Sequence, residues 1–204
     1  MIPMTGSTPS AAASEAPLDV QVLQTAASLE NLAVASYTTA AKLPFVVGGS
    51  AQLRALIARN TAHHTAHAQA FNLSAHKAGG AEQHAADARY AANVGKILAT
   101  TADPTSLVGL FTELEDIIAQ TCTRYAILAT GGGVRSQFAS VASVEAQHGA
   151  ELLIVRTLLD AGRAQPAGTA AAAVALPAAV GTAGIPLAVY LTADASAINE
   201  GVVR

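Results

Sequence analysis

One pattern of metal-ligand residues occurs twice along this chain of 204 residues. In each half, a carboxylate inside an apolar stretch is followed by two ligand-type residues that lie three positions apart. Residues with that spacing share one face of an α-helix, so each pair would present two ligand side chains together. Two helix pairs of this kind indicate a metal site inside a four-helix bundle. The residues are Glu30 with His64 and His67, then Glu115 with Glu145 and His148.

The composition favours an all-α fold with a sizeable core. Hydrophobic residues make up 51% of the chain, but only 4% are aromatic and none is Trp, which in an Ala-rich chain favours closely packed helices over a sheet. Charged residues make up 12% and the net charge is −3, so no basic face exists for nucleic acid. Because charge is costly to bury without a partner, the Glu residues inside apolar stretches require an explanation.

Turn and capping residues divide the chain into four long helices. Asp19 can cap a first helix that runs to about residue 42, and a second covers residues 50–77. A third starts after Asp103-Pro104 and runs to about residue 130, and a fourth follows the glycine turn at 131–133 and ends near residue 162. Residues 81–103 form a long, more polar link with room for a short helix around residues 85–98. Links that run short, long, short pair the first helix with the second and the third with the fourth.

The two ends of the chain differ from this bundle, which we place at residues 18–162. Residues 1–17 lack the basic start and apolar core of an intact signal peptide, so we expect a flexible segment that leaves two locations equally open, exported to the cell envelope or cytoplasmic. Residues 164–191 carry no charge and are long enough to cross a bilayer, yet Pro and Gly residues interrupt them. An irregular tail over residues 163–204, packed on the bundle, is therefore favoured over a membrane span.

Helical spacing turns the ligand-type residues toward the interior of the bundle. Glu30 shares its helix face with Leu23 and Tyr37, and Glu115 shares its face with Cys122. In the same way, Ile57, Asn60 and Phe71 accompany His64 and His67, and Phe138, Val141 and Leu152 accompany Glu145 and His148.

Six such groups in one interior layer favour a bound metal. Unpaired buried carboxylates would protonate, whereas a divalent cation keeps them ionised and holds the imidazoles as neutral ligands. A mixed carboxylate and imidazole shell suits iron, manganese or zinc.

At Glu30, Glu115 and Glu145-x-x-His148 the chain resembles the ferritin-like superfamily of di-metal carboxylate proteins, over about residues 18–162. In that superfamily, one Glu comes from each of two helices and a Glu-x-x-His pair comes from each of the other two. The resemblance implies a four-helix bundle with a long crossover between the second and third helices, and a di-iron or di-manganese centre. Glu30 and Glu115 match the single carboxylates, and Glu145 with His148 matches one pair.

The second helix departs from this pattern, because His64-x-x-His67 stands where the superfamily has Glu-x-x-His. The change removes one carboxylate that could bridge two ions, so a single ion or an asymmetric pair competes with a full di-metal centre. Tyr37 resembles a tyrosine that hydrogen-bonds a ligand carboxylate or takes part in radical chemistry in several members. A packed core tyrosine is the alternative interpretation.

The other candidate residues are interpreted as surface or core residues. Cys122, the only cysteine, excludes an intrachain disulfide and fills core space, with contact to the metal shell as the alternative. No strand precedes the glycine turn to form a phosphate-binding loop, and no nucleophile or dinucleotide motif is present. Glu113 and Asp116 fall off the apolar face that holds Glu115, and we expect His63, His76 and His84 on the surface.

Two functions agree with these features. The first is a ferritin-like metal-binding protein whose iron or manganese centre has an open coordination position for oxygen, peroxide or ferrous iron. The second is a non-catalytic bundle with a structural ion such as zinc, or with a vestigial polar layer. In that second case the tail would mediate self-association into a homo-oligomer or attachment to the cell envelope, without insertion into a membrane.

Overall fold

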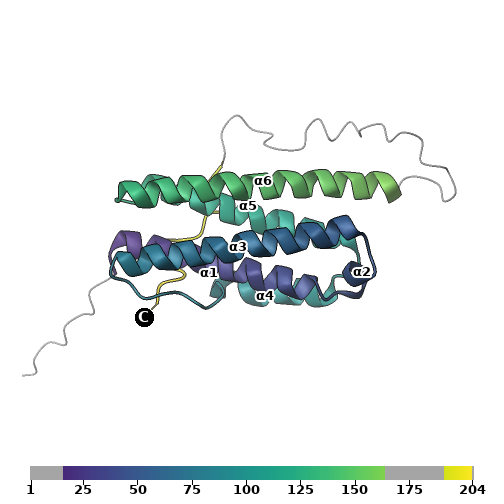
Figure 1. Cartoon of the computed structure of the whole chain (residues 1–204), viewed down its shortest axis with the longest axis horizontal. Helices are drawn as coiled ribbons and strands as arrows, with labels where there is room; N and C mark the ends of the chain where they lie inside the picture. The colour runs from purple at the N-terminus through teal and green to yellow at the C-terminus, as the bar shows by residue number, and fades with distance from the viewer. Residues whose placement is uncertain (1–15, 164–190, 204) are drawn as a thin grey trace, which may run out of the picture.

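The computed structural model describes residues 16–163 and 191–203, and this part of the chain contains helices and no strand. The four long helices lie side by side, and the two shorter helices are found at the edge and one end of the bundle (Figure 1). The predicted all-α fold is confirmed. The helices are α1 (Leu18–Ala40), α2 (Pro44–Val47), α3 (Ala51–Lys77), α4 (Ala88–Thr100), α5 (Pro104–Leu128) and α6 (Gly132–Arg163).

The long helices associate in two pairs. α1 packs mainly on α3, and α5 packs mainly on α6, as the short links predict. The long crossover between these pairs contains α4, which packs on α1 and corresponds to the short helix expected around residues 85–98. The short helix α2 is not predicted by the sequence; Pro44 occupies its first turn.

Side chains cap the starts of three helices. The Asp103 carboxylate accepts hydrogen bonds from the backbone N–H groups of Thr105 (2.9 Å) and Ser106 (3.0 Å) at the start of α5. Ser50 caps α3 and Asp87 caps α4 in the same manner. These caps satisfy backbone donors that a helix start leaves without partners within the helix.

The prediction that Asp19 caps the first helix is wrong. α1 begins at Leu18 after Pro17, so Asp19 already lies in the first turn. Its carboxylate accepts hydrogen bonds from the backbone N–H groups of Thr130 (2.7 Å) and Gly131 (2.9 Å). Asp19 therefore ties the turn between α5 and α6 to the start of α1.

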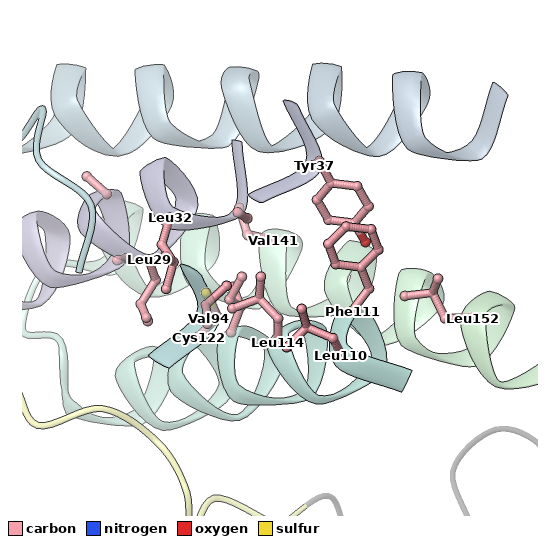
Figure 2. Close-up of a cluster of buried hydrophobic side chains, with 14 of the residues drawn as sticks. Leu29, Leu32, Tyr37, Val94, Leu110, Phe111, Leu114, Cys122, Val141 and Leu152 are labelled. Carbon is pink, nitrogen blue, oxygen red and sulfur yellow. The ribbon is translucent and has the colours of Figure 1, made fainter. Parts of the chain in front are cut away.

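Apolar side chains from all four long helices fill the interior of the bundle. Figure 2 shows part of this core, with labelled side chains from α1, α4, α5 and α6. Tyr37 of α1 stacks on Phe111 of α5, with ring centroids 3.8 Å apart and planes inclined by 17°. Cys122 lies in this core with 1% of its surface exposed, and burial followed by the charge of Glu30 raises the pKa of its thiol well above the ordinary value. The thiol is therefore protonated at neutral pH.

The C-terminal segment, residues 191–203, crosses the bundle without forming a helix (Figure 1). Its backbone N–H groups are bound by side chains of the helices: Asp194 N donates to Gln120 Oε1 (2.9 Å), and Ser196 N donates to Thr121 Oγ1 (2.9 Å). The Tyr125 hydroxyl lies 3.0 Å from the carbonyl oxygen of Ser196. These partners explain several polar side chains that are buried on α5.

The same segment is fixed to α1 at Gly201. Gly201 N donates to Thr25 Oγ1 (3.0 Å), and a Cβ atom at Gly201 would lie 2.6 Å from the Thr25 Cα and 2.5 Å from the Ser28 Oγ. Only glycine fits so close to the helix backbone. Residues 1–15 and 164–190 lie outside the described residues. The expectations of a flexible N-terminal segment and of an irregular tail in place of a membrane span fall on these two ranges. Among the helices described, none combines the length and the apolar character that crossing a bilayer requires.

Candidate metal centre

The six ligand-type residues meet midway along the four long helices. Glu30 comes from α1, His64 and His67 from α3, Glu115 from α5, and Glu145 and His148 from α6. Glu30, His64, Glu115 and Glu145 have no exposed surface, and the side chains of His148 and His67 are 4% and 14% exposed. The side chains thus form one buried polar layer within an apolar core.

Two groups of candidate ligands can be distinguished in this layer. The first consists of Glu30, His64, His67 and Glu145, and the second of His64, Glu115, Glu145 and His148. Within each group the ligand atoms lie within 4.8 Å of one another, close to twice the roughly 2.0–2.2 Å length of a bond from such atoms to a metal ion. The sequence suggested two halves with no common member, whereas the structure places His64 and Glu145 in both groups.

In the first group, carboxylates surround two imidazole rings. His64 Nδ1 lies 2.7 Å from Glu30 Oε2 and 3.8 Å from Glu145 Oε1. His67 Nδ1 lies 2.6 Å from Glu145 Oε1 and 3.6 Å from Glu30 Oε1, but neither contact has the alignment of a hydrogen bond.

Three atoms of this first group are therefore buried without a hydrogen-bond partner. They are Glu30 Oε1, Glu145 Oε1 and His67 Nδ1, and they face one another. His67 can form an ion pair with these carboxylates, but the contacts lack hydrogen-bond alignment, so the three atoms are less well satisfied than those of the second group. Two carboxylate oxygens and an imidazole nitrogen that converge in this way fit a divalent cation.

In the second group, the contacts resemble ordinary hydrogen bonds and ion pairs. His148 Nδ1 lies 3.3 Å from Glu115 Oε2 and 3.2 Å from Glu145 Oε2, and His64 Nε2 lies 3.1 Å from Glu115 Oε1. The hydroxyl of Tyr37 also donates to Glu115 Oε1. Tyr37 therefore contacts a candidate ligand as well as the core.

The comparisons with known proteins agree with this architecture. The profile of the ferritin-like domain family matches residues 18–159, which span all six helices apart from the last turn of α6. The chain belongs to the ferritin-like family. No curated protein and no solved structure matches it significantly. Membership of the family supports the fold directly, and the buried Glu and His cluster is consistent with its di-metal carboxylate site.

The electrostatics of this ferritin-like domain depend on whether the layer holds a cation. Burial opposes the charged form of His67 and His148, but the surrounding carboxylates outweigh this effect and raise the pKa of each to about 9. Burial and then the charge of Glu30 raise the pKa of Glu145 to about 7. Burial also opposes ionisation of Glu115, yet the charge of His64 holds its pKa well below the ordinary value. Without a metal ion, imidazolium cations balance the buried carboxylates.

We expect the metal-free protein to lose stability as the pH rises from about 6.5 to 9. His67 and His148 have a pKa of 6.5 when unfolded and about 9 when folded, so their stabilising contribution is complete below 6.5 and lost above 9. Glu145 acts in the same direction between 4.5 and about 7, because the fold favours its neutral form. Thermal unfolding of metal-free protein at a series of pH values tests this. A melting temperature that is constant or increases over that range would contradict the assignment.

His63, expected on the surface, also contacts the centre. It is half-buried, it stacks on His148 with ring centroids 5.1 Å apart, and its Nδ1 lies 2.9 Å from His148 Nε2. His148 therefore turns Nε2 toward His63 and Nδ1 toward the carboxylates. Glu113, Asp116, His76 and His84 are exposed, as expected.

Asn60 contributes to the centre through Tyr37. It has no exposed surface, and its Nδ2 lies 3.3 Å from the Tyr37 hydroxyl. Its spacing, four residues before His64, placed it on the ligand-bearing face of α3, but spacing alone gave no reason to connect it with Tyr37.

Proposed function

We propose that this ferritin-like domain binds iron or manganese between its four long helices and uses it in an oxidoreductase reaction with oxygen, peroxide or ferrous iron. The observation that carries the proposal is the convergence of Glu30 Oε1, Glu145 Oε1 and His67 Nδ1, all buried and all without a hydrogen-bond partner. A divalent cation would satisfy all three atoms at once.

The donor set favours these metals. Three carboxylates and three imidazoles supply only oxygen and nitrogen ligands, which suit iron, manganese and zinc and disfavour metals that require thiolates. A bound iron or manganese ion would supply the ability to exchange electrons with a small oxidant, which no side chain of the layer has. The residues of the chain would hold the ion, neutralise its charge and exclude water.

The burial of the layer restricts what can reach it. Of the six residues only His67, with a side chain 14% exposed, and His148, at 4%, reach the surface. Because so little of the layer is exposed, we propose that metal ions, dioxygen and peroxide reach it and that bulky organic substrates do not. This access supports small inorganic substrates.

Tyr37 would act on the centre through Glu115. Burial and then the adjacent Glu115 charge raise the pKa of its hydroxyl well above the ordinary value, so the group is protonated and donates to Glu115 Oε1. We propose that this hydrogen bond fixes the orientation of the carboxylate. A redox role for Tyr37 would require transfer of its proton to Glu115 at the same time.

Elemental analysis of protein purified without chelators and without a nickel column tests the proposal. We expect one or two iron or manganese ions per chain, and loss of these ions in the double variant Glu145→Ala/His148→Ala, because it removes two ligand side chains from one helix. The double variant Glu113→Ala/His76→Ala, which removes an exposed carboxylate and an exposed imidazole, should retain the metal. Turnover of ferrous iron or hydrogen peroxide should follow metal content.

The second candidate, a structural or vestigial centre, is favoured by one observation. Each nitrogen of His64 faces a carboxylate oxygen, at 2.7 Å and 3.1 Å, so part of the layer is satisfied without a metal. Stoichiometric zinc with no redox activity would favour a structural ion. Absence of any metal, even after reconstitution with iron, manganese and zinc in turn, would refute the proposed function.

A further inference from the structure

An apolar groove lies between α3 and α6 at the end of the bundle where α5 begins. The start of α3 and the end of α6 lie together at this end, beside α2 (Figure 1). These two long helices belong to different pairs and contact each other far less than each contacts its own partner. The groove between them has a volume of about 550 Å³, and mostly hydrophobic side chains line it. They include Phe45 of α2, Leu53 and Leu56 of α3, and Val155, Leu158 and Leu159 of α6.

The charges at this groove compensate each other. Among the described residues that line it, Arg59 and Glu151 carry the charged side chains, and they form an ion pair with each other. Leu158, a large apolar residue of the lining, is 42% exposed. Since removal of apolar surface from water is favourable, the groove is suited to an occupant that is itself apolar and uncharged.

A segment with this character follows α6 directly in the sequence. Residues 164–190 contain no charged residue, and residues 169–176 read Thr-Ala-Ala-Ala-Ala-Val-Ala-Leu. α6 extends to Arg163, one turn beyond the Leu159 that lines the groove. Residues 164–168 contain a proline and a glycine, which favour a turn over a continued helix. The sequence can therefore return from the end of α6 toward the groove.

The length of chain on either side of residues 169–176 permits this placement. Residues 164–168 can span roughly 16 Å when extended, more than the roughly 6 Å that the last turn of α6 adds beyond the groove. Residues 177–190 can span roughly 46 Å. They need to cover about 24 Å along α5, from Pro104 at the groove to Gln120, whose side chain binds the backbone of Asp194.

We propose that residues 169–176 of the same chain bind in the groove between α3 and α6. They cover Leu158 and the apolar side chains beside it, and residues 177–190 then continue to the segment 191–203 that is fixed on α1 and α5. Attachment through residues 164–168 gives the segment an effective concentration on the order of a millimolar, which a second copy of the chain does not reach in dilute solution. The inference is independent of the proposed metal-binding function.

Two exposed positions one turn apart on α6 provide matched variants. Leu158 lines the groove at 42% exposure, whereas Ile154 is 40% exposed and does not line it. Leu158→Asp introduces a charge against the bound segment, and Ile154→Asp introduces the same charge outside the groove. Both variants should fold, because neither position is buried.

Amide hydrogen exchange of the full chain tests the contact. We expect residues 169–176 to exchange at least about tenfold more slowly than an unstructured peptide of the same sequence. Leu158→Asp should remove this protection, and Ile154→Asp should retain it.

A spin label locates the segment without a change to the apolar lining. Gln52 lines the groove and Gln69 lies roughly 26 Å further along α3, and both are exposed. Cys122 is 1% exposed and should not react with the label. A label on Gln52→Cys should broaden the NMR signals of residues 169–176, whereas a label on Gln69→Cys should leave them sharp.

Three results would overturn the inference. The first is exchange of residues 169–176 in the unmodified chain as fast as in the peptide, and the second is an equal loss of protection in Leu158→Asp and Ile154→Asp. The third is broadening that arises only between a spin-labelled chain and a separate, isotope-labelled chain, which would assign the groove to a second copy of the protein.

Discussion

Glu115→Ala is expected to lower the free energy of unfolding of the metal-free protein by about 3–5 kcal/mol, because it removes one partner from a buried network of charges. Glu115 has no exposed surface and contacts His64, His148 and the Tyr37 hydroxyl. Its loss would leave two imidazoles without one of the carboxylates that raise their pKa, and a buried hydroxyl without an acceptor. Urea denaturation of the metal-free protein measures the change.

Two control variants distinguish the effect of the Glu115 charge on stability from the effect of its buried location. Glu113→Ala, on the exposed side of the same helix, should change the free energy of unfolding by less than about 0.5 kcal/mol. Glu115→Gln keeps an acceptor for Tyr37 but removes the charge, so its effect should lie between the other two. A loss below about 1 kcal/mol for Glu115→Ala would show that the buried network does not stabilise the fold in this form.

Gly201→Val is expected to displace residues 191–203 from the bundle and to cost about 2–4 kcal/mol, because several hydrogen bonds and their buried surface are lost together. The new Cβ would lie 2.6 Å from the Thr25 Cα, and helix backbone cannot move to make room. Release would also expose Thr121 and Tyr125, whose partners are in this segment. Thermal unfolding and hydrogen exchange of residues 191–203 measure the two effects.

Gly95→Ala is the matched control for this substitution. Gly95 lies within α4, and a Cβ there meets no atom within 4 Å. Replacement by alanine inside a helix should stabilise the protein by roughly 0.5–1 kcal/mol. If Gly201→Val left both the stability and the hydrogen exchange of the segment unchanged, the close approach at Gly201 would not be what holds the segment in place.

Most of what the sequence predicted about the fold and the ligand-type residues rests on helical periodicity. Glu30, Glu115 and Glu145 were predicted to face the interior of the bundle because each lies on an apolar helix face with a period of 3.6 residues. Such a face packs toward the core of a bundle. Short links at residues 41–50 and 129–131 then decided which helices are neighbours. Both arguments use local information, which the sequence contains.

The details that the sequence could not supply depend on the orientation of side chains and on contacts between residues far apart in the chain. His63 is adjacent to the inward-facing His64, so helical spacing turns it away from the interior. At this point, however, α3 and α6 lie close enough for His63 Nδ1 to contact His148 Nε2. Whether Glu145 serves one ligand group or two depends on the orientation of one carboxylate. Residues 191–203 show neither helical nor strand periodicity. Polar side chains of α1 and α5 hold this irregular segment in place by hydrogen bonds to its backbone.

The layer of candidate ligands also lies at the seam between the two helix pairs. The first ligand group takes Glu30, His64 and His67 from the α1–α3 pair and Glu145 from the α5–α6 pair, so an ion there would join the two as a cross-link. A cross-link of this kind makes the pairs open together, whereas without it each can open as a separate cooperative unit. The supply of metal around the protein would then set the cooperativity of unfolding, so that a shortage of metal would appear first as greater susceptibility to proteolysis of one helix pair.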